Sequence, residues 1–265
     1  MVKIKKLTNI KGLLIDLDGT LYFKGNPIPG AIETLKKLRQ IGLKFLLFTN
    51  IDSKSPQTIL KFLQDYGFTV NKDELFTPII ALKEFLTKYR NKKSFFVTTT
   101  EVEKEFQDFP KVDSNGSEMP DFVIIGDFRD NWDVNRLNLA FKFVFKGAKL
   151  LGTQGNRYFL DRKGEPVLDT GSFVKLIANA ADVGPQIFGK PSKEYFLQAL
   201  NKLDLDANEV IVIGDDLETD IAGAINMGLI AFLVRTGKGQ FYKSSTSQIS
   251  PFTLINSLNS ILDYF

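Results

Sequence analysis

Short, uninterrupted runs of apolar residues recur along this chain, and each is followed by a polar or glycine-containing segment. Leu13–Ile15, Phe45–Phe48 and Val210–Ile213 are the clearest of these runs. Runs of this length that end in turn residues are typical of strands buried on both faces of a parallel sheet. Further strands are expected at Phe95–Val97, Phe122–Ile125, Lys149–Leu151, Ile187–Phe188 and Ala231–Val234.

Amphipathic helices are expected between many of these strands. The segment from Gly30 to Ile41 carries apolar residues at helical spacing, and Ser55 followed by Pro56 marks the start of a second helix, which Gly67 ends. Further helices are expected over Val134–Phe145 and around Phe196, Leu197 and Leu200. The alternation of strands and helices predicts an α/β fold built on a doubly wound, mainly parallel sheet.

Polar residues follow four of the predicted strands. In chain order they are Asp16 and Asp18, Thr49 and Asn50, Lys190, and Asp215 with Asp216 and Asp220. Because the carboxyl ends of parallel strands meet at one edge of a sheet, we expect all four groups at the edge where ligands bind. A solvated turn explains one such loop but not four. Two carboxylates ~5 Å apart repel by about 3 kcal/mol at an effective dielectric near 20, so this edge is expected to hold a cation or to share a proton.

Composition narrows the classes of protein. The chain has 265 residues, enough for two domains, and 43% of them are hydrophobic. A net charge of +3, from 34 basic and 31 acidic residues, is too balanced to indicate binding to nucleic acid or to an anionic membrane. Lysines interrupt the apolar residues near the N-terminus, and no apolar run is long enough to span a membrane. We therefore expect a cytoplasmic protein.

The chain contains no cysteine and no histidine. Disulfides, thiol nucleophiles, thiolate metal sites and a Ser-His-Asp triad are thereby excluded. Hydrolytic chemistry would have to use carboxylates, lysine, hydroxyl groups and a hard metal ion. Mg²⁺ prefers such oxygen ligands, and Asp16 and Asp215 are the first candidates to chelate it.

These residue types suit phosphoryl transfer. Asp16 could attack phosphorus and form an aspartyl-phosphate, while Asp18 protonates the leaving oxygen and later deprotonates water. Lys190 and Thr49 could hold the phosphate oxygens, and Asn50 is a further contact to the phosphate or to the nucleophile. At least one of Asp216 and Asp220 is expected to orient Lys190 or a metal-bound water.

At these residues the chain resembles the haloacid dehalogenase superfamily. The run Asp16-Leu17-Asp18-Gly19-Thr20 corresponds to the DxDGT motif, and Thr49, Lys190 and the run Gly214 to Asp220 supply the other three motifs in order. The resemblance implies that Asp16 is the nucleophile and Asp18 the acid/base. It also implies that Mg²⁺ is bound by the Asp16 carboxylate, the Asp18 backbone carbonyl and Asp215. An aspartate at position 18 favours a phosphatase over a dehalogenase.

The spacing of the motifs is similar to that of one branch of the superfamily. About 140 residues separate Thr49 from Lys190, an insertion that resembles the large α/β cap of subfamily IIA, the p-nitrophenyl-phosphatase and NagD-like branch. After Thr49 and Asn50 this branch usually has a run of polar residues, and Ile51 and Asp52 depart from it. The resemblance implies a catalytic core joining residues 1–78 to 186–265 and a smaller α/β cap over residues 79–185.

Cap residues are expected to select the substrate, a small phosphorylated metabolite. The segment from Gly155 to Phe173 resembles the haloacid-dehalogenase-like domain-containing and phospholysine-phosphatase-type members, and Arg157 and Phe173 are its candidate substrate contacts. Asp127, Asp130 and Asp133 suit a helix N-terminus better than a second metal site.

A Mg²⁺-dependent phosphomonoester phosphatase is the leading functional hypothesis. A phosphotransferase and a non-catalytic phosphate-binding or interaction domain of the same fold remain open. The resemblance also allows a homodimer formed through the cap, and it implies no nucleic-acid or membrane partner.

Overall fold

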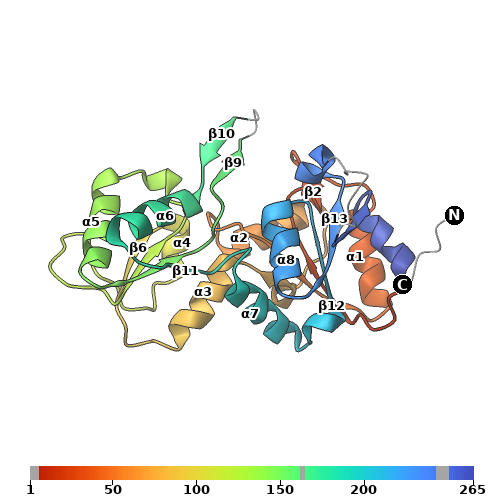
Figure 1. Cartoon of the computed structure of the whole chain (residues 1–265), viewed down its shortest axis with the longest axis horizontal. Helices are drawn as coiled ribbons and strands as arrows, with labels where there is room; N and C mark the ends of the chain where they lie inside the picture. Colours follow the sequence, from red (N-terminus) through yellow and green to blue (C-terminus); the bar gives the residue numbers. More distant parts are fainter. Residues whose placement is uncertain (1–5, 162–164, 243–250) are drawn as a thin grey trace. The chain divides into compact units, whose positions relative to one another are not determined.

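A computed structural model describes residues 6–161, 165–242 and 251–265 (Figure 1). The chain divides into two compact units. The six-strand unit comprises Met1–Thr49, Leu60–Phe76 and Phe196–Phe265. The four-strand unit comprises Asn50–Ile59 and Thr77–Tyr195. Each unit is named for its main sheet and is described by itself.

The sheet of the six-strand unit is parallel throughout and has the strand order β14-β13-β12-β1-β4-β5. Its strands are β1 (Gly12–Ile15), β4 (Lys44–Phe48), β5 (Leu75–Phe76), β12 (Val210–Gly214), β13 (Ile230–Val234) and β14 (Thr253–Ile255). All residues of β1 and β12 are buried, as the apolar runs predict for central strands of a parallel sheet.

Helices complete the six-strand unit. They are α1 (Ala31–Gln40) and α8 (Ala222–Asn226), together with parts of α2 (Pro56–Asp65) and α7 (Lys193–Leu203). Helices α2 and α7 begin in the four-strand unit. Phe196 of α7 packs edge-on against Phe48 of β4, with ring centroids 5.0 Å apart. Shorter elements are the hairpin β2 (Tyr22–Phe23) and β3 (Asn26–Pro27), the 3-10 helices Lys72–Glu74, Ala207–Glu209, Gly237–Phe241 and Leu258–Tyr264, and a π-helical turn at Leu217–Ile221.

The four-strand unit has its own parallel sheet, in the order β11-β8-β7-β6. The strands are β6 (Ser94–Val97), β7 (Phe122–Ile125), β8 (Lys149–Gly152) and β11 (Gln186–Ile187). The helices of this unit are α3 (Pro78–Thr87), α4 (Thr100–Lys104), α5 (Val134–Phe145) and α6 (Thr170–Ala181), with a 3-10 turn at Arg129–Asn131. A separate antiparallel hairpin joins β9 (Tyr158–Leu160) to β10 (Pro166–Leu168).

Successive side chains of β6 pack in two different apolar regions of the four-strand unit. Phe95 and Val97 belong to the apolar cluster that contains Phe143 of α5 and Val174 of α6. Phe96 stacks instead at a tilt against Phe106, which follows α4, with ring centroids 5.1 Å apart. Because successive strand residues point to opposite faces, this sheet is covered on both sides.

The predicted fold class is confirmed: the chain is an α/β protein with a parallel six-strand sheet and a separate, inserted parallel four-strand sheet. The expectation that all four polar strand endings share one sheet edge is wrong for Lys190. Lys190 lies after β11, which pairs with β8 of the smaller sheet. Among the described residues, no helix has the length and apolar character needed to cross a membrane.

Candidate active site

Three neighbouring strands of the large sheet end at predicted site residues. Asp16 directly follows β1, Asp215 follows β12 and Thr49 follows β4. In the register of the sheet, Ile15 lies between Ile213 and Leu47, and the Asp16 N–H donates to the Ile213 carbonyl oxygen at 2.9 Å. The parallel pairing therefore brings the three polar endings to one edge, as the sequence predicts.

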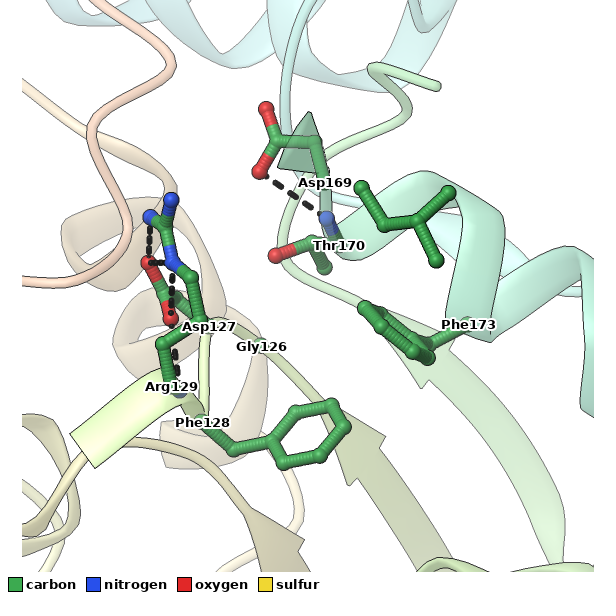
Figure 2. Close-up of a pocket in the computed structure, with 8 residues that line it drawn as sticks. Gly126, Asp127, Phe128, Arg129, Asp169, Thr170 and Phe173 are labelled. Carbon is green, nitrogen blue, oxygen red and sulfur yellow. Dashed lines mark hydrogen bonds and ion pairs between the residues drawn. The ribbon is translucent and has the colours of Figure 1, made fainter. Parts of the chain in front are cut away.

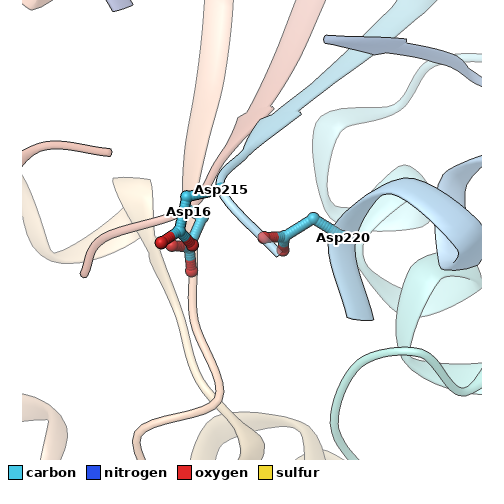
Figure 3. Close-up of side chains that lie close together, drawn as sticks. All are labelled: Asp16, Asp215 and Asp220. Atoms are coloured by element: carbon cyan, nitrogen blue, oxygen red, sulfur yellow. The ribbon is translucent and has the colours of Figure 1, made fainter. Parts of the chain in front are cut away.

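Asp16, Asp215 and Asp220 form a buried acidic cluster at this edge (Figure 3). Each offers a carboxylate oxygen within 4.8 Å of the others, and their exposed fractions are 8%, 6% and 1%. Asp220 comes close because Gly214 lacks a side chain, since a Cβ at position 214 would collide with the Asp220 carboxylate. Asp220, expected to orient Lys190 or a water, thus lies beside the two predicted metal ligands.

The electrostatics of the cluster favour a bound cation. Burial, together with the negative charges of Asp16 and Asp220, holds the pKa of Asp215 well above its usual range. Three carboxylates at this separation repel one another, and a divalent cation would remove that repulsion. The donor set consists of hard oxygen ligands, which suits Mg²⁺.

The loop of Asp18 and Gly19 lies against the same cluster. Gly19 has a φ of +81°, and a Cβ there would collide with the Asp215 carboxylate, so this position requires glycine for its conformation and for the close approach. Loss of surrounding water raises the pKa of Asp18, although Asp18 keeps an exposed surface and the charge of Lys238 opposes the rise. A raised pKa is what a general acid needs.

Lys238 is a site residue that the sequence analysis missed. Its ammonium group pairs with Asp216 at 2.5 Å, and its backbone N–H donates to Oδ2 of Asp215 at 2.6 Å. Asp216 also accepts hydrogen bonds from the N–H groups of Glu218 and Thr219. Asp216 therefore orients Lys238. The sequence signal was a Gly-Lys-Gly run shortly after β13, at the same end of the sheet.

Lys190 and Asn50 are joined within the four-strand unit. Asn50 Oδ1 accepts a hydrogen bond from the Lys190 N–H at 2.7 Å, and Asn50 Nδ2 donates to the Lys190 carbonyl oxygen at 3.0 Å. Asn50 Nδ2 also lies 3.1 Å from Oδ1 of Asn156. Lys190 is 2% exposed. The pairing of an amide side chain with both backbone groups of Lys190 fixes this residue in the loop after β11.

The candidate substrate contacts of the four-strand unit lie in different surroundings. Phe173 lines a small pocket (Figure 2) together with Phe128 and Asp169. Its ring meets Phe128 edge-on, at a centroid distance of 4.9 Å. Arg157 is exposed, and its carbonyl oxygen accepts the N–H of Asp169 at 3.1 Å.

Asp127, Asp130 and Asp133 each bind a different partner. Asp133 caps α5 by accepting the N–H of Asn135 at 2.8 Å, as a carboxylate at a helix N-terminus should. Asp130 accepts the N–H of Thr100 at 3.1 Å. Asp127 pairs with the guanidinium group of Arg129. In the described part of the chain, these three do not form a metal-ligand cluster.

Comparisons with known proteins cover nearly the whole chain. Residues 13–109 match the family described as haloacid dehalogenase-like hydrolase, and residues 187–261 match one described as HAD-hydrolase-like. Haloacid dehalogenase-like hydrolase domain-containing protein 2 of Mus musculus is 32% identical, over 90% of this chain and 88% of that protein. The phospholysine phosphohistidine inorganic pyrophosphate phosphatase of Xenopus laevis is 29% identical over 96% and 94%. A p-nitrophenyl phosphatase from Archaeoglobus fulgidus superimposes with a TM-score of 0.85 at 25% identity, over 97% and 99%.

Proposed function

The chain belongs to the haloacid dehalogenase-like hydrolases, and from this premise we propose that it is a Mg²⁺-dependent phosphomonoester hydrolase that works through an aspartyl-phosphate. The observation that carries the proposal is the buried cluster of Asp16, Asp215 and Asp220 at the carboxyl ends of β1 and β12. The alignment of solved p-nitrophenyl phosphatases with nearly the full chain supports the same reaction class.

The acidic cluster would hold the metal ion. Asp16 and Asp215 would supply carboxylate oxygens, Asp18 its backbone carbonyl, and Asp220 a further carboxylate or a hydrogen bond to a ligand water. Bound Mg²⁺ would neutralise charge on the phosphate and on the carboxylates that surround it. The nucleophile could then approach a dianionic ester without the repulsion that the cluster alone would impose.

The reaction divides between two aspartates. An oxygen of Asp16 attacks phosphorus and the bond from phosphorus to the ester oxygen breaks, while the Asp18 carboxyl group gives its proton to that oxygen. The ionised Asp18 then takes a proton from water, whose oxygen attacks the aspartyl-phosphate and releases inorganic phosphate and Asp16. Thr49, Asn50 and Lys190 would hold the phosphate oxygens through both steps.

The domain assignment belongs to the same proposal. Residues 1–78 and 186–265 would form the catalytic core, and residues 79–185 a cap that selects a small phosphorylated metabolite. The four-strand unit also includes Asn50–Ile59 and extends to Tyr195, so it contains Asn50 and Lys190, which the proposed mechanism uses. Arg157 and Phe173 are proposed substrate contacts of this cap.

The decisive experiment is hydrolysis of p-nitrophenyl phosphate by the purified protein, with Mg²⁺ and with EDTA, beside the variant Asp16→Asn. We expect turnover that requires Mg²⁺ and that Asp16→Asn abolishes while its fold, followed by circular dichroism, is retained. Asp65→Asn, at an exposed position of α2, is the matched control and should keep full activity. Substantial turnover by a folded Asp16→Asn protein would remove Asp16 from the role of nucleophile.

Two results would redirect the proposal toward the other functions. Transfer of the phosphoryl group to a competing alcohol in preference to water would identify a phosphotransferase. Binding of Mg²⁺ and of inorganic phosphate without turnover of any ester in a metabolite panel would identify a binding domain.

A further inference from the structure

Asp52 is a buried acidic residue that the proposed mechanism does not use. It follows β4 by four residues and is 3% exposed. Ionised carboxylates are rarely buried unless other groups bond to them, because removal from water disfavours their charge. The contacts of Asp52 therefore indicate what keeps it there.

Two threonine hydroxyl groups donate to the same oxygen of Asp52. Thr153 Oγ1 donates to Oδ2 at 2.5 Å and Thr170 Oγ1 at 2.7 Å. Thr153 directly follows β8 and Thr170 begins α6. The Thr153 hydroxyl also lies 3.4 Å from the Ile125 carbonyl oxygen, but it has one proton, and the shorter bond to a carboxylate is the stronger of the two. Asp52 thus joins three separate segments of the four-strand unit.

Charged groups surround this carboxyl group. The negative charges of Asp127, after β7, and Asp169, before α6, act on it. The positive charge of Arg129 also interacts with Asp52, and its guanidinium pairs with Asp127 (Figure 2). Burial and the two neighbouring negative charges raise the pKa of Asp52 to about 7, against the opposing effect of the two threonine bonds. Its charge therefore changes near neutral pH.

The segment that begins at Asn50 connects Asp52 to Lys190. Asn50 bonds both backbone groups of Lys190 and the side chain of Asn156, while Asp52 bonds Thr153 at the other end of the same short loop, residues 153–156. The loop passes close to the residue before Lys190, because a Cβ on Gly189 would lie 2.8 Å from the Thr153 carbonyl oxygen and only glycine fits there. A chain of close contacts thus links Asp52 to Asn50 and Lys190.

We propose that Asp52 is a positioning residue, whose ionised carboxylate, by binding Thr153 and Thr170, fixes the geometry of Asn50 and Lys190, and whose protonation weakens that hold. Charge-assisted hydrogen bonds are roughly twice as strong as neutral ones, so the ionised form holds both threonines more firmly. The inference rests on the proposed function, in which Asn50 and Lys190 bind the phosphate group. Asp52 itself contacts neither the phosphate nor the reacting atoms in this account.

The test uses Asp52→Asn, which retains a carbonyl acceptor but never becomes charged. The rates of p-nitrophenyl phosphate hydrolysis are measured as KM and kcat from about pH 5.5 to about pH 8.5. We expect wild type and variant to agree at the acidic end and to diverge above neutrality, where the variant has a roughly tenfold lower kcat/KM, mostly from a higher KM. An unchanged pH profile and an unchanged KM in Asp52→Asn would overturn the proposal.

Threonine-to-valine substitutions test whether a loss of activity comes from the bonds to Asp52 or from impaired folding. Thr153→Val and Thr170→Val each remove one bond to Asp52, and both should raise KM. Thr98→Val is the control, because Thr98 is a buried threonine of the same unit whose hydroxyl donates to the Thr99 carbonyl oxygen at 3.3 Å. Its KM should equal that of wild type. Equal effects of all three valine substitutions would assign the result to general loosening of the unit and reject a specific role for Asp52.

A readout without turnover separates this inference from the proposed function. Binding of inorganic phosphate is measured by calorimetry at the two ends of the pH range, and the carboxyl carbon resonance of Asp52 is followed by NMR and assigned with Asp52→Asn. If no ester is hydrolysed, the proposed function fails, yet phosphate binding that tightens as Asp52 ionises would still support the positioning role. A carboxyl resonance that titrates near the usual range of aspartate, with pH-independent phosphate binding, would refute it.

Discussion

The backbone N–H of Lys238 donates a 2.6 Å hydrogen bond to Oδ2 of Asp215, the residue that begins the loop after the neighbouring strand β12. Two residues earlier, the Thr236 hydroxyl donates to the Gly19 carbonyl oxygen at 2.5 Å. The segment after β13 is therefore bonded both to the Asp18-Gly19 loop and to a proposed metal ligand. The orientation of the acidic cluster depends on this segment as well as on the strands that carry the acids.

Replacing Gly237 by alanine should displace Asp215. A Cβ at position 237 would collide with the Asp215 carboxylate and lie 2.5 Å from Gly19 Cα, and the φ of Gly237 is +55°. We expect Gly237→Ala to lose most Mg²⁺-dependent hydrolysis of p-nitrophenyl phosphate, at least tenfold in kcat/KM, with a stability loss of about 1–3 kcal/mol. Kinetics and urea unfolding measure the two effects.

Gly228→Ala is the control for backbone strain. Gly228 also has a positive φ, +71°, but a Cβ there would meet nothing within 4 Å. Its stability should fall by about 1 kcal/mol from the φ penalty alone, with activity retained. Similar activity in both variants would show that Gly237 has no influence on the position of Asp215.

Asp220→Asn should raise stability without Mg²⁺ and reduce the stabilisation that Mg²⁺ provides. The negative charge of Asp220 raises the pKa of Asp215, which shows that the two repel when no cation is bound. Without Mg²⁺ the variant should therefore unfold at a higher temperature than wild type. Mg²⁺ should stabilise the variant less than it stabilises wild type. The difference is about 1.4 kcal/mol if the variant's affinity for Mg²⁺ is tenfold lower. Equal gains from Mg²⁺ in both proteins, measured by thermal unfolding, would place Asp220 outside the metal site.

The central strands and the first acidic residues could be predicted because their signals are local. Leu13–Ile15 and Val210–Ile213 are continuous apolar runs, and a parallel strand buried on both faces needs that pattern. Asp16 and Asp215 follow them directly, so their convergence requires only that the strands be parallel neighbours. Helix α3 gave no such signal, since its first residues, Pro78 to Leu82, are all apolar and show no helical period.

The remaining site depends on contacts between residues far apart in sequence. Asp52 and Thr153 are separated by 101 positions, and Lys238 and Asp216 by 22. Nothing in the residues around Asp52 reveals that two threonines will bind it. Lys190 was assigned to the wrong sheet for a similar reason, because β11 has two residues and its pairing with β8 is a long-range choice. Local patterns thus predict strands and their endings, whereas the partners of buried polar groups follow from the fold.

Arg129→Met should destabilise the four-strand unit. Asp127 is 4% exposed and the Arg129 guanidinium is its ion-pair partner, so the variant leaves a buried carboxylate without its counter-charge. Because the guanidinium itself is partly exposed, we expect a loss of about 2 kcal/mol in urea unfolding. Adding Asp127→Asn should recover part of the loss. A double variant that is less stable by the sum of the single effects would mean that the two residues do not interact.

Asp52 should make the stability of the protein fall as the pH rises toward neutrality. The unfolded chain releases the Asp52 proton near its usual pKa of 3.8, whereas the folded protein keeps it up to about 7. Between these values the folded state binds more protons than the unfolded state, so the free energy of unfolding decreases with pH, by up to ~4 kcal/mol in total. Asp52→Asn removes this term and should be more stable than wild type above neutral pH, with little difference near pH 4. Chemical unfolding at several pH values measures the slope, and parallel curves for the two proteins would show that Asp52 titrates normally in the fold.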